Sequence, residues 1–198
     1  MDERAVPAAP PAPRVAPGPW PDLRPLLRRE LESYLTGVAA FDPGLPTRCP
    51  PWTVRDLTRH VAATFERYVA LLAQGRRGDF APPFGPDDLA EVNLRDVREL
   101  AGDPEGRLHA AATAFLAETG DADEPIPSHK GTRPVGVQLA FALRELAVHH
   151  DDAAHAAGTA YLPPPDVVAA LVASYRRLGL WDENAPPEWA TFVDKRGS

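Results

Sequence analysis

The sequence predicts an all-α protein, an antiparallel four-helix bundle with long loops and an extra C-terminal helix. Apolar residues recur every three or four positions over several long segments, and no alternating strand pattern exceeds four residues. Stretches rich in Pro and Gly separate those segments. A chain of 198 residues is long enough to enclose a core. We therefore expect one bundle domain over residues 20–198.

The preceding segment, residues 1–19, is expected to be a disordered tail. It consists mostly of Ala and Pro and carries almost no large side chains. Such a segment cannot bury enough apolar surface to offset the entropy that is lost on ordering.

Start signals define the first two helices. The first is expected over residues 22–40, with Asp22 as its cap. The second begins at Thr53, where Thr53 and Asp56 form a capping box, and ends near Gly75. Its apolar face comprises Val54, Leu57, Val61, Phe65, Tyr68, Val69 and Leu72.

Three further helical regions follow. Residues 86–117 are interrupted at residues 102–104 (Gly-Asp-Pro), which predicts either two helices or one helix with a break. The next helix spans residues 135–157 and ends at Gly158, and a shorter one spans residues 166–178. From residue 179 we expect a short irregular tail.

Composition excludes several classes of function. The net charge of −7 argues against nucleic acid as the main partner, because no basic stripe faces phosphates. No apolar run approaches the roughly 20 residues that cross a bilayer, and no secretory signal precedes the domain. The single cysteine, Cys49, cannot form an internal disulfide, so we expect a cytoplasmic protein in which this thiol is simply packed. Abundant Arg, Ala and Pro indicate a GC-rich bacterial genome.

Two distant segments, residues 49–60 and 144–152, carry the candidate chemistry. His60 borders the apolar face of the second helix, while Glu145 and His149 are four residues apart and share a face of a later helix. Bundles build metal sites from facing helices, and two imidazoles with one carboxylate suit Zn²⁺, Fe²⁺ or Ni²⁺. The pattern predicts an open metal site formed by His60, Glu145 and His149.

Plainer interpretations stand beside this one. A Glu–His pair is common on solvated salt-bridged faces, and a single histidine near a core is commonly hydrogen-bonded there. Asp152 either orients an imidazole, contacts substrate or is a helix-surface carboxylate. The remaining histidines are not assigned to the metal: His150 is expected to be exposed with Asp151, as is His155, His109 has no partner, and His129 lies in a loop that could fold over the site.

The two segments together resemble the mycothiol-dependent maleylpyruvate isomerase family of the DinB-like superfamily. The resembling residues are Cys49-Pro50, Trp52-Thr53-Val54, Asp56-Leu57 and His60, then Arg144-Glu145-Leu146, Val148-His149 and Asp152. The resemblance implies a DinB-like bundle in which His60, Glu145 and His149 hold a divalent metal, usually zinc. It also implies mycothiol as co-substrate, because a zinc-bound thiol is deprotonated at neutral pH and can attack an electrophilic carbon.

Two departures from the family pattern shape the expected activity. The isomerase carries a further C-terminal domain, and this chain ends soon after the bundle, so we expect a smaller S-transferase or a pathway-specific enzyme. In many members of the superfamily a histidine stands at the position that matches Glu145. The identity of the metal is therefore left open.

Three functions therefore remain open. The first is an enzyme that uses the thiol as a metal-activated nucleophile for S-transfer to, or isomerisation of, a small electrophile. The second is a metal-dependent hydrolase, and the third is a non-catalytic metal-binding bundle. Loops 75–86 and 118–133 are expected to line the pocket above the ion. We expect a monomer or homodimer without nucleic-acid or membrane partners.

Overall fold

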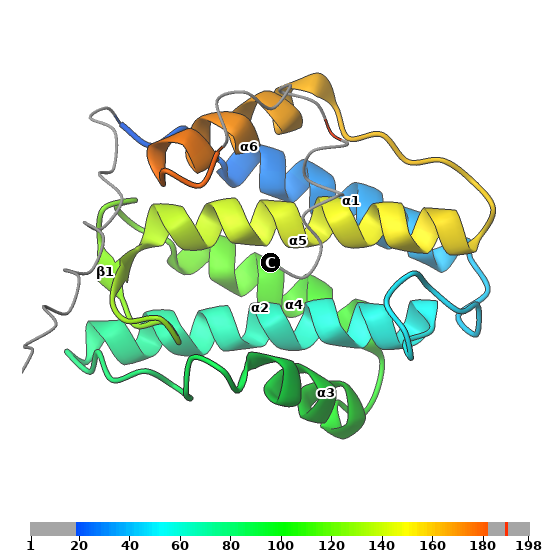
Figure 1. Ribbon diagram of the computed structural model, residues 1–198, viewed down its shortest axis with the longest axis horizontal. Coiled ribbons are helices and arrows are strands. Elements are labelled where there is room, and N and C mark those ends of the chain that lie inside the picture. Colours follow the sequence, from blue (N-terminus) through cyan, green and yellow to red (C-terminus); the bar gives the residue numbers. More distant parts are fainter. Residues whose placement is uncertain (1–18, 182–188, 190–198) are drawn as a thin grey trace, which may run out of the picture.

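The computed structural model describes residues 19–181 and residue 189, and in these ranges it confirms the all-α bundle (Figure 1). Four helices form the bundle: α1 (Arg24–Ala39), α2 (Val54–Arg76), α4 (Pro104–Glu118) and α5 (Val135–Ala156). A disordered tail was predicted over residues 1–19, and residues 1–18 of it lie outside the described residues.

The bundle consists of two parallel pairs that run antiparallel to each other. Helices α2 and α4 pack side by side, and Glu66–Arg107 and Arg76–Glu118 ion pairs join them at matching heights. Helices α1 and α5 form the second pair. The direction is the same within the α2/α4 pair because the long connection over residues 77–103 returns the chain to the end where α2 began.

Local capping agrees with the sequence at α2 and differs at α1. The Thr53 hydroxyl accepts a hydrogen bond from the Asp56 N–H at 3.3 Å, and the Thr53 N–H donates to the Asp56 carboxylate at 3.2 Å, which confirms the capping box. Helix α1, in contrast, begins at Arg24 after Leu23, so the prediction of Asp22 as its cap is wrong. The Asp22 carboxylate instead accepts from the Arg24 N–H at 3.3 Å.

The predicted break within residues 86–117 separates two helices. Asp103 caps α4 by accepting hydrogen bonds from the N–H groups of Glu105 and Gly106. The preceding helix, α3 (Leu89–Glu99), packs on α2, outside the bundle. The C-terminal helix α6 (Pro165–Arg177) packs on α5, and Figure 1 shows α3 and α6 on opposite sides of the molecule.

A small hairpin that the sequence did not predict lies in the connection between α4 and α5. Strands β1 (Pro125–Ile126) and β2 (Arg133–Pro134) pair antiparallel, with Pro125 opposite Pro134. Two residues per strand are too few for an alternating pattern to be visible. The hairpin fixes loop 118–133 across one end of the space between α2 and α5.

The core lies between the four bundle helices and extends to the first residues after α6. Its largest enclosed side chains include Tyr34, Phe65 and Phe115. Trp181, the third residue of the predicted irregular tail, is also buried in this core. Most of that tail, residues 182–188 and 190–198, lies outside the described residues. None of the helices in the described ranges combines the length and apolar character that a membrane crossing needs.

Candidate metal centre

His60 lies on the inner face of α2 and is 6% exposed. The indole of Trp52 stacks on its imidazole, with ring centroids 4.7 Å apart and planes inclined by 29°. Trp52, which precedes the start of α2, therefore fixes the ring plane of His60. The Nε2 atom of His60 faces α5, while its enclosed Nδ1 atom has no hydrogen-bond partner.

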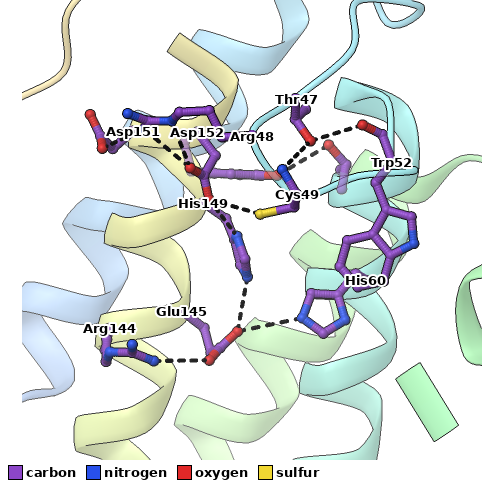
Figure 2. A network of polar contacts seen from close by, with 12 residues as sticks. Thr47, Arg48, Cys49, Trp52, His60, Arg144, Glu145, His149, Asp151 and Asp152 are labelled. Atoms are coloured by element: carbon purple, nitrogen blue, oxygen red, sulfur yellow. Dashed lines mark hydrogen bonds and ion pairs between the residues drawn. The ribbon is translucent and has the colours of Figure 1, made fainter. Parts of the chain in front are cut away.

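Glu145 and His149 on α5 meet His60 across the bundle (Figure 2). The Glu145 Oε2 atom is 3.2 Å from His149 Nε2 and 3.5 Å from His60 Nε2. The two imidazole centroids are 5.2 Å apart. One ligand atom from each residue lies within 4.8 Å of the others. The structure thus brings the three predicted side chains to a separation that one cation could bridge.

The charges of this cluster are coupled. Burial raises the pKa of Glu145, but hydrogen bonds with His149 and His60 outweigh it, so the pKa of this carboxyl lies well below its usual range. Burial also lowers the pKa of His149, and hydrogen bonds with Asp152, Cys49 and Glu145 reverse that effect, so its pKa lies well above the ordinary value. The pKa of His60 is lowered, mainly by burial. A cation that binds here must therefore displace a proton from His149.

Asp152 supports His149 from the side opposite Glu145. Its side chain has no solvent exposure, and its Oδ2 atom is 3.2 Å from His149 Nδ1. The interpretation of Asp152 as a helix-surface carboxylate is therefore wrong. Arg48 donates from Nε to Asp152 Oδ1 at 3.1 Å and pairs with Asp151 at 2.6 Å. An acceptor at Nδ1 leaves His149 Nε2 directed at the cluster.

Cys49 belongs to the same network, which sequence reasoning missed (Figure 2). Its Sγ atom is 3.3 Å from Asp152 Oδ2, and one ligand atom each of Cys49, His149 and Asp152 also lie within 4.8 Å of one another. This second set would use the other nitrogen of His149 and a carboxylate already paired with Arg48. The only available signal was that Cys49 lies in the same motif as His60.

A cavity of about 630 Å³ opens beside the first set. His60 and Glu145 are part of its wall, whereas His149, Cys49 and Asp152 are not. The prediction that loops 75–86 and 118–133 line this pocket is confirmed. Their contributions to the wall are Pro83 and Phe84, then Ser128, His129, Lys130 and Arg133. The first set therefore has access to a space of ligand size.

The expectation that His150 is exposed is wrong. It is 6% exposed and packs against α1, where its Nδ1 atom is 3.3 Å from the Oε1 atom of the buried Glu30. The Tyr161 ring stacks on it at 3.9 Å and its hydroxyl donates to Glu30. Glu30 occupies a position one residue before Leu31 on the apolar side of α1, a signal that the sequence did contain.

The remaining side chains considered in the sequence analysis lie outside the metal cluster. The expectation that Asp151 is exposed is also wrong, because it is half-buried in its ion pair with Arg48. His109 and His155 are exposed, as expected for His155. His129 lines the cavity and stacks on Phe84, with centroids 5.7 Å apart, so its loop does fold over the site.

Comparison with known families agrees with this geometry. The family model described as the mycothiol maleylpyruvate isomerase N-terminal domain matches residues 24–154, a range that includes α1 to α4, all but the last two residues of α5, and all residues of the cluster up to Asp152. No match was found among curated proteins or among solved structures. The chain therefore belongs to the mycothiol maleylpyruvate isomerase N-terminal domain family, a DinB-like family.

Proposed function

We propose that this protein is a metal-dependent enzyme that uses a low-molecular-weight thiol, mycothiol, for S-transfer to a small electrophile or for its isomerisation. One observation carries the proposal: two imidazoles and one carboxylate converge, and two of these groups, His60 and Glu145, line a cavity of about 630 Å³. Three protein ligands leave coordination positions for a substrate, as is typical of catalytic rather than structural zinc sites. The family membership supports the choice of thiol.

In this proposal His60, Glu145 and His149 hold the ion. Zn²⁺ is favoured, and Fe²⁺ or Ni²⁺ accept the same donors. When bound, the cation supplies positive charge that stabilises a thiolate at neutral pH. Glu145 binds in its ionised form, which its lowered pKa favours.

The surrounding residues position the ligands. Asp152 accepts the Nδ1 proton of His149 and so directs Nε2 toward the ion, while Arg48 holds Asp152 in place. Trp52 restricts the ring plane of His60. The cavity then receives the electrophile at the edge formed by His60 and Glu145.

The test is conjugate formation by the zinc-loaded chain with mycothiol and a panel of small electrophiles, measured by mass spectrometry. We expect conjugate above the rate of the uncatalysed reaction, and loss of that excess in chelator-stripped protein. The matched pair His149→Ala and His150→Ala separates a site effect from a general effect on α5. Zinc-loaded protein that gives no conjugate with any electrophile would contradict the proposal.

Two further measurements separate the other functions. If the protein is a hydrolase, added thiol competes with water and lowers turnover of a hydrolysable substrate instead of raising it. If it is a non-catalytic bundle without a metal, added zinc leaves its melting temperature unchanged, because binding to the folded state alone must raise it. A cytoplasmic location and a monomeric or homodimeric state stay predictions.

A further inference from the structure

The cavity beside the metal cluster has a positive charge that contrasts with the rest of the chain. Its wall contains four basic side chains and one acidic side chain, Glu145, although the whole chain carries a net charge of −7. The basic side chains are Arg67, Lys130, Arg133 and Arg144. An acidic protein that gathers basic groups around one cavity favours an anionic ligand there.

Acidic neighbours compensate only part of this charge. Arg144 lies 3.8 Å from Glu145, and Arg67 lies 3.6 Å from Asp96. Lys130 and Arg133 form no ion pair within 4.0 Å anywhere in the described ranges. The hairpin end of the cavity therefore holds two basic groups without a carboxylate partner.

Arg67 brings a third positive charge to this end. It follows His60 by seven residues on the same face of α2, which places it about 10 Å along the helix from the metal cluster. Its Nη2 atom donates to Asn93 at 3.0 Å, but its enclosed Nε and Nη1 atoms have no hydrogen-bond partner. Unpaired buried N–H groups are unfavourable, so an acceptor that entered the cavity would stabilise the guanidinium.

The three basic side chains line the same cavity as His129, and their charges act on its ring. Its pKa is lowered by burial and then by the charges of Lys130, Arg133 and Arg67. His129 is therefore a neutral ring among three cations at neutral pH, and it adds no charge of its own.

Aromatic rings form the walls between this end and the metal cluster. The Arg67 guanidinium lies over the Phe84 ring at 5.7 Å, and the Arg133 guanidinium lies over the Phe141 ring at 6.0 Å. Tyr175 packs against Phe141 with centroids 6.1 Å apart. A flat apolar body fits such walls, with an anionic group beside the cations.

We propose that Arg67, Lys130 and Arg133 form an anion subsite that binds the carboxylate of an aromatic or similarly flat electrophile, with its body directed along Phe84 and Phe141 toward His60 and Glu145. The assignment of this ligand as the electrophile rests on the proposed function. The subsite itself rests on charge and shape alone. Binding of a non-reactive acid therefore tests it without any reaction.

The probes are 2-naphthoate, its neutral analogue 2-naphthamide, and acetate, which keeps the carboxylate without the rings. Dissociation constants are measured by calorimetry on the full chain, both chelator-stripped and zinc-loaded. In both forms we expect 2-naphthoate to bind about tenfold more tightly than 2-naphthamide, the equivalent of one good charged contact. Acetate should bind at least about tenfold more weakly than 2-naphthoate, because it lacks the apolar body. Added salt should reduce the preference for 2-naphthoate over 2-naphthamide.

Matched variants locate the preference. Lys130→Gln with Arg133→Gln, and separately Arg67→Gln, should reduce the tenfold preference to about threefold or less. The control is Arg98→Gln, which removes the same charge from an exposed site on α3 outside the cavity and should leave the preference unchanged. The double variant changes only half-buried or exposed side chains, so it tests the subsite even where Arg67→Gln unfolds the chain.

Equal affinity of the wild type for naphthoate and naphthamide would overturn the subsite, as would a preference that both sets of variants retain. A naphthoate preference in stripped protein, together with no thiol conjugate in zinc-loaded protein, would overturn only the proposed reaction. The two failures are thus distinguishable.

Discussion

His149 and His150 are neighbours on α5, yet the helix directs them into opposite environments. His149 faces His60 on α2 and contacts Glu145 one turn earlier on α5, and a large cavity opens beside these two partners. His150 faces α1, where Glu30 and Tyr161 close around it. Each side thus contains a histidine in contact with a glutamate, but the environments differ in what else surrounds the pair.

The difference shows which features distinguish a candidate metal centre from a buried polar cluster. On the α2 side His60 adds a third donor, and Asp152 occupies the remaining nitrogen of His149. On the α1 side the third group is a phenol, and Gly37 lies against the remaining nitrogen of His150. The first arrangement leaves a donor atom from each residue directed at one point, whereas the second is filled by packing.

The largest expected effect separates the two histidines directly. His149→Ala should lower the affinity for Zn²⁺ by at least about a hundredfold, since loss of a supporting residue alone typically costs ten- to hundredfold. His60→Ala should likewise remove most bound metal, and Glu145→Ala should have a smaller effect where water replaces the carboxylate. Competition with a chromophoric chelator measures these affinities.

His150→Ala is the matched control for this change. It should leave the affinity for Zn²⁺ within about threefold of wild type, yet reduce the free energy of unfolding by about 1–3 kcal/mol, because Glu30 loses a buried partner. A reversed pattern, with metal lost on the α1 side, would show that the two sides have been assigned the wrong way round.

The next prediction concerns the hydrogen bond between His149 Nδ1 and Asp152. Asp152→Asn should weaken zinc binding about tenfold to a hundredfold, because an amide is a poorer acceptor for the Nδ1 proton. Asp87→Asn removes a charge from an exposed position outside this network and serves as control. Cys49→Ala should leave the affinity nearly unchanged; a loss as large as that of His149→Ala would place the ion among Cys49, His149 and Asp152 instead.

The pH dependence of zinc binding provides a third test. The pKa of His149 is raised well above its ordinary value, so near neutral pH the ion must displace a proton from this ring. Apparent affinity should therefore increase with pH, by about tenfold per unit below that pKa, and the increase should continue above pH 6.5. His60, with its lowered pKa, contributes no such proton. A flat affinity between pH 6 and 8 would contradict this protonation state.

Much of the fold and the three central residues could be predicted because the signals are local or periodic. The capping box at Thr53 and the break before Pro104 depend on adjacent residues. The four-residue spacing of Glu145 and His149 puts them on one face whatever the tertiary structure. His60 lies next to a seven-residue apolar stripe, so it had to face the bundle.

What could not be predicted depends on which helices become neighbours. His150 lies only one position from His149. It is buried because α1 packs on α5, and these two helices are far apart in the sequence. Asp152 is buried where it pairs with Arg48, which lies in the loop between α1 and α2. The cavity wall combines Arg67 with Lys130 and Arg133 from a hairpin of two-residue strands. No local pattern encodes these contacts.

The smallest effect concerns the closed packing on the α1 side. Gly37 lies inside α1, and a Cβ atom there would be 2.7 Å from His150 Nε2. Alanine is favoured over glycine within a helix by about 1 kcal/mol, whereas overpacking costs about 1–3 kcal/mol. Because Glu30 and Tyr161 restrain the imidazole, we expect overpacking to prevail, so that Gly37→Ala destabilises the fold by about 1 kcal/mol in urea denaturation.

Ser33→Ala, at an exposed position of the same helix, should be neutral or slightly stabilising. Zinc affinity should not change in either variant, and a stabilised Gly37→Ala protein would mean that His150 moves freely and that its side of α5 is not closed.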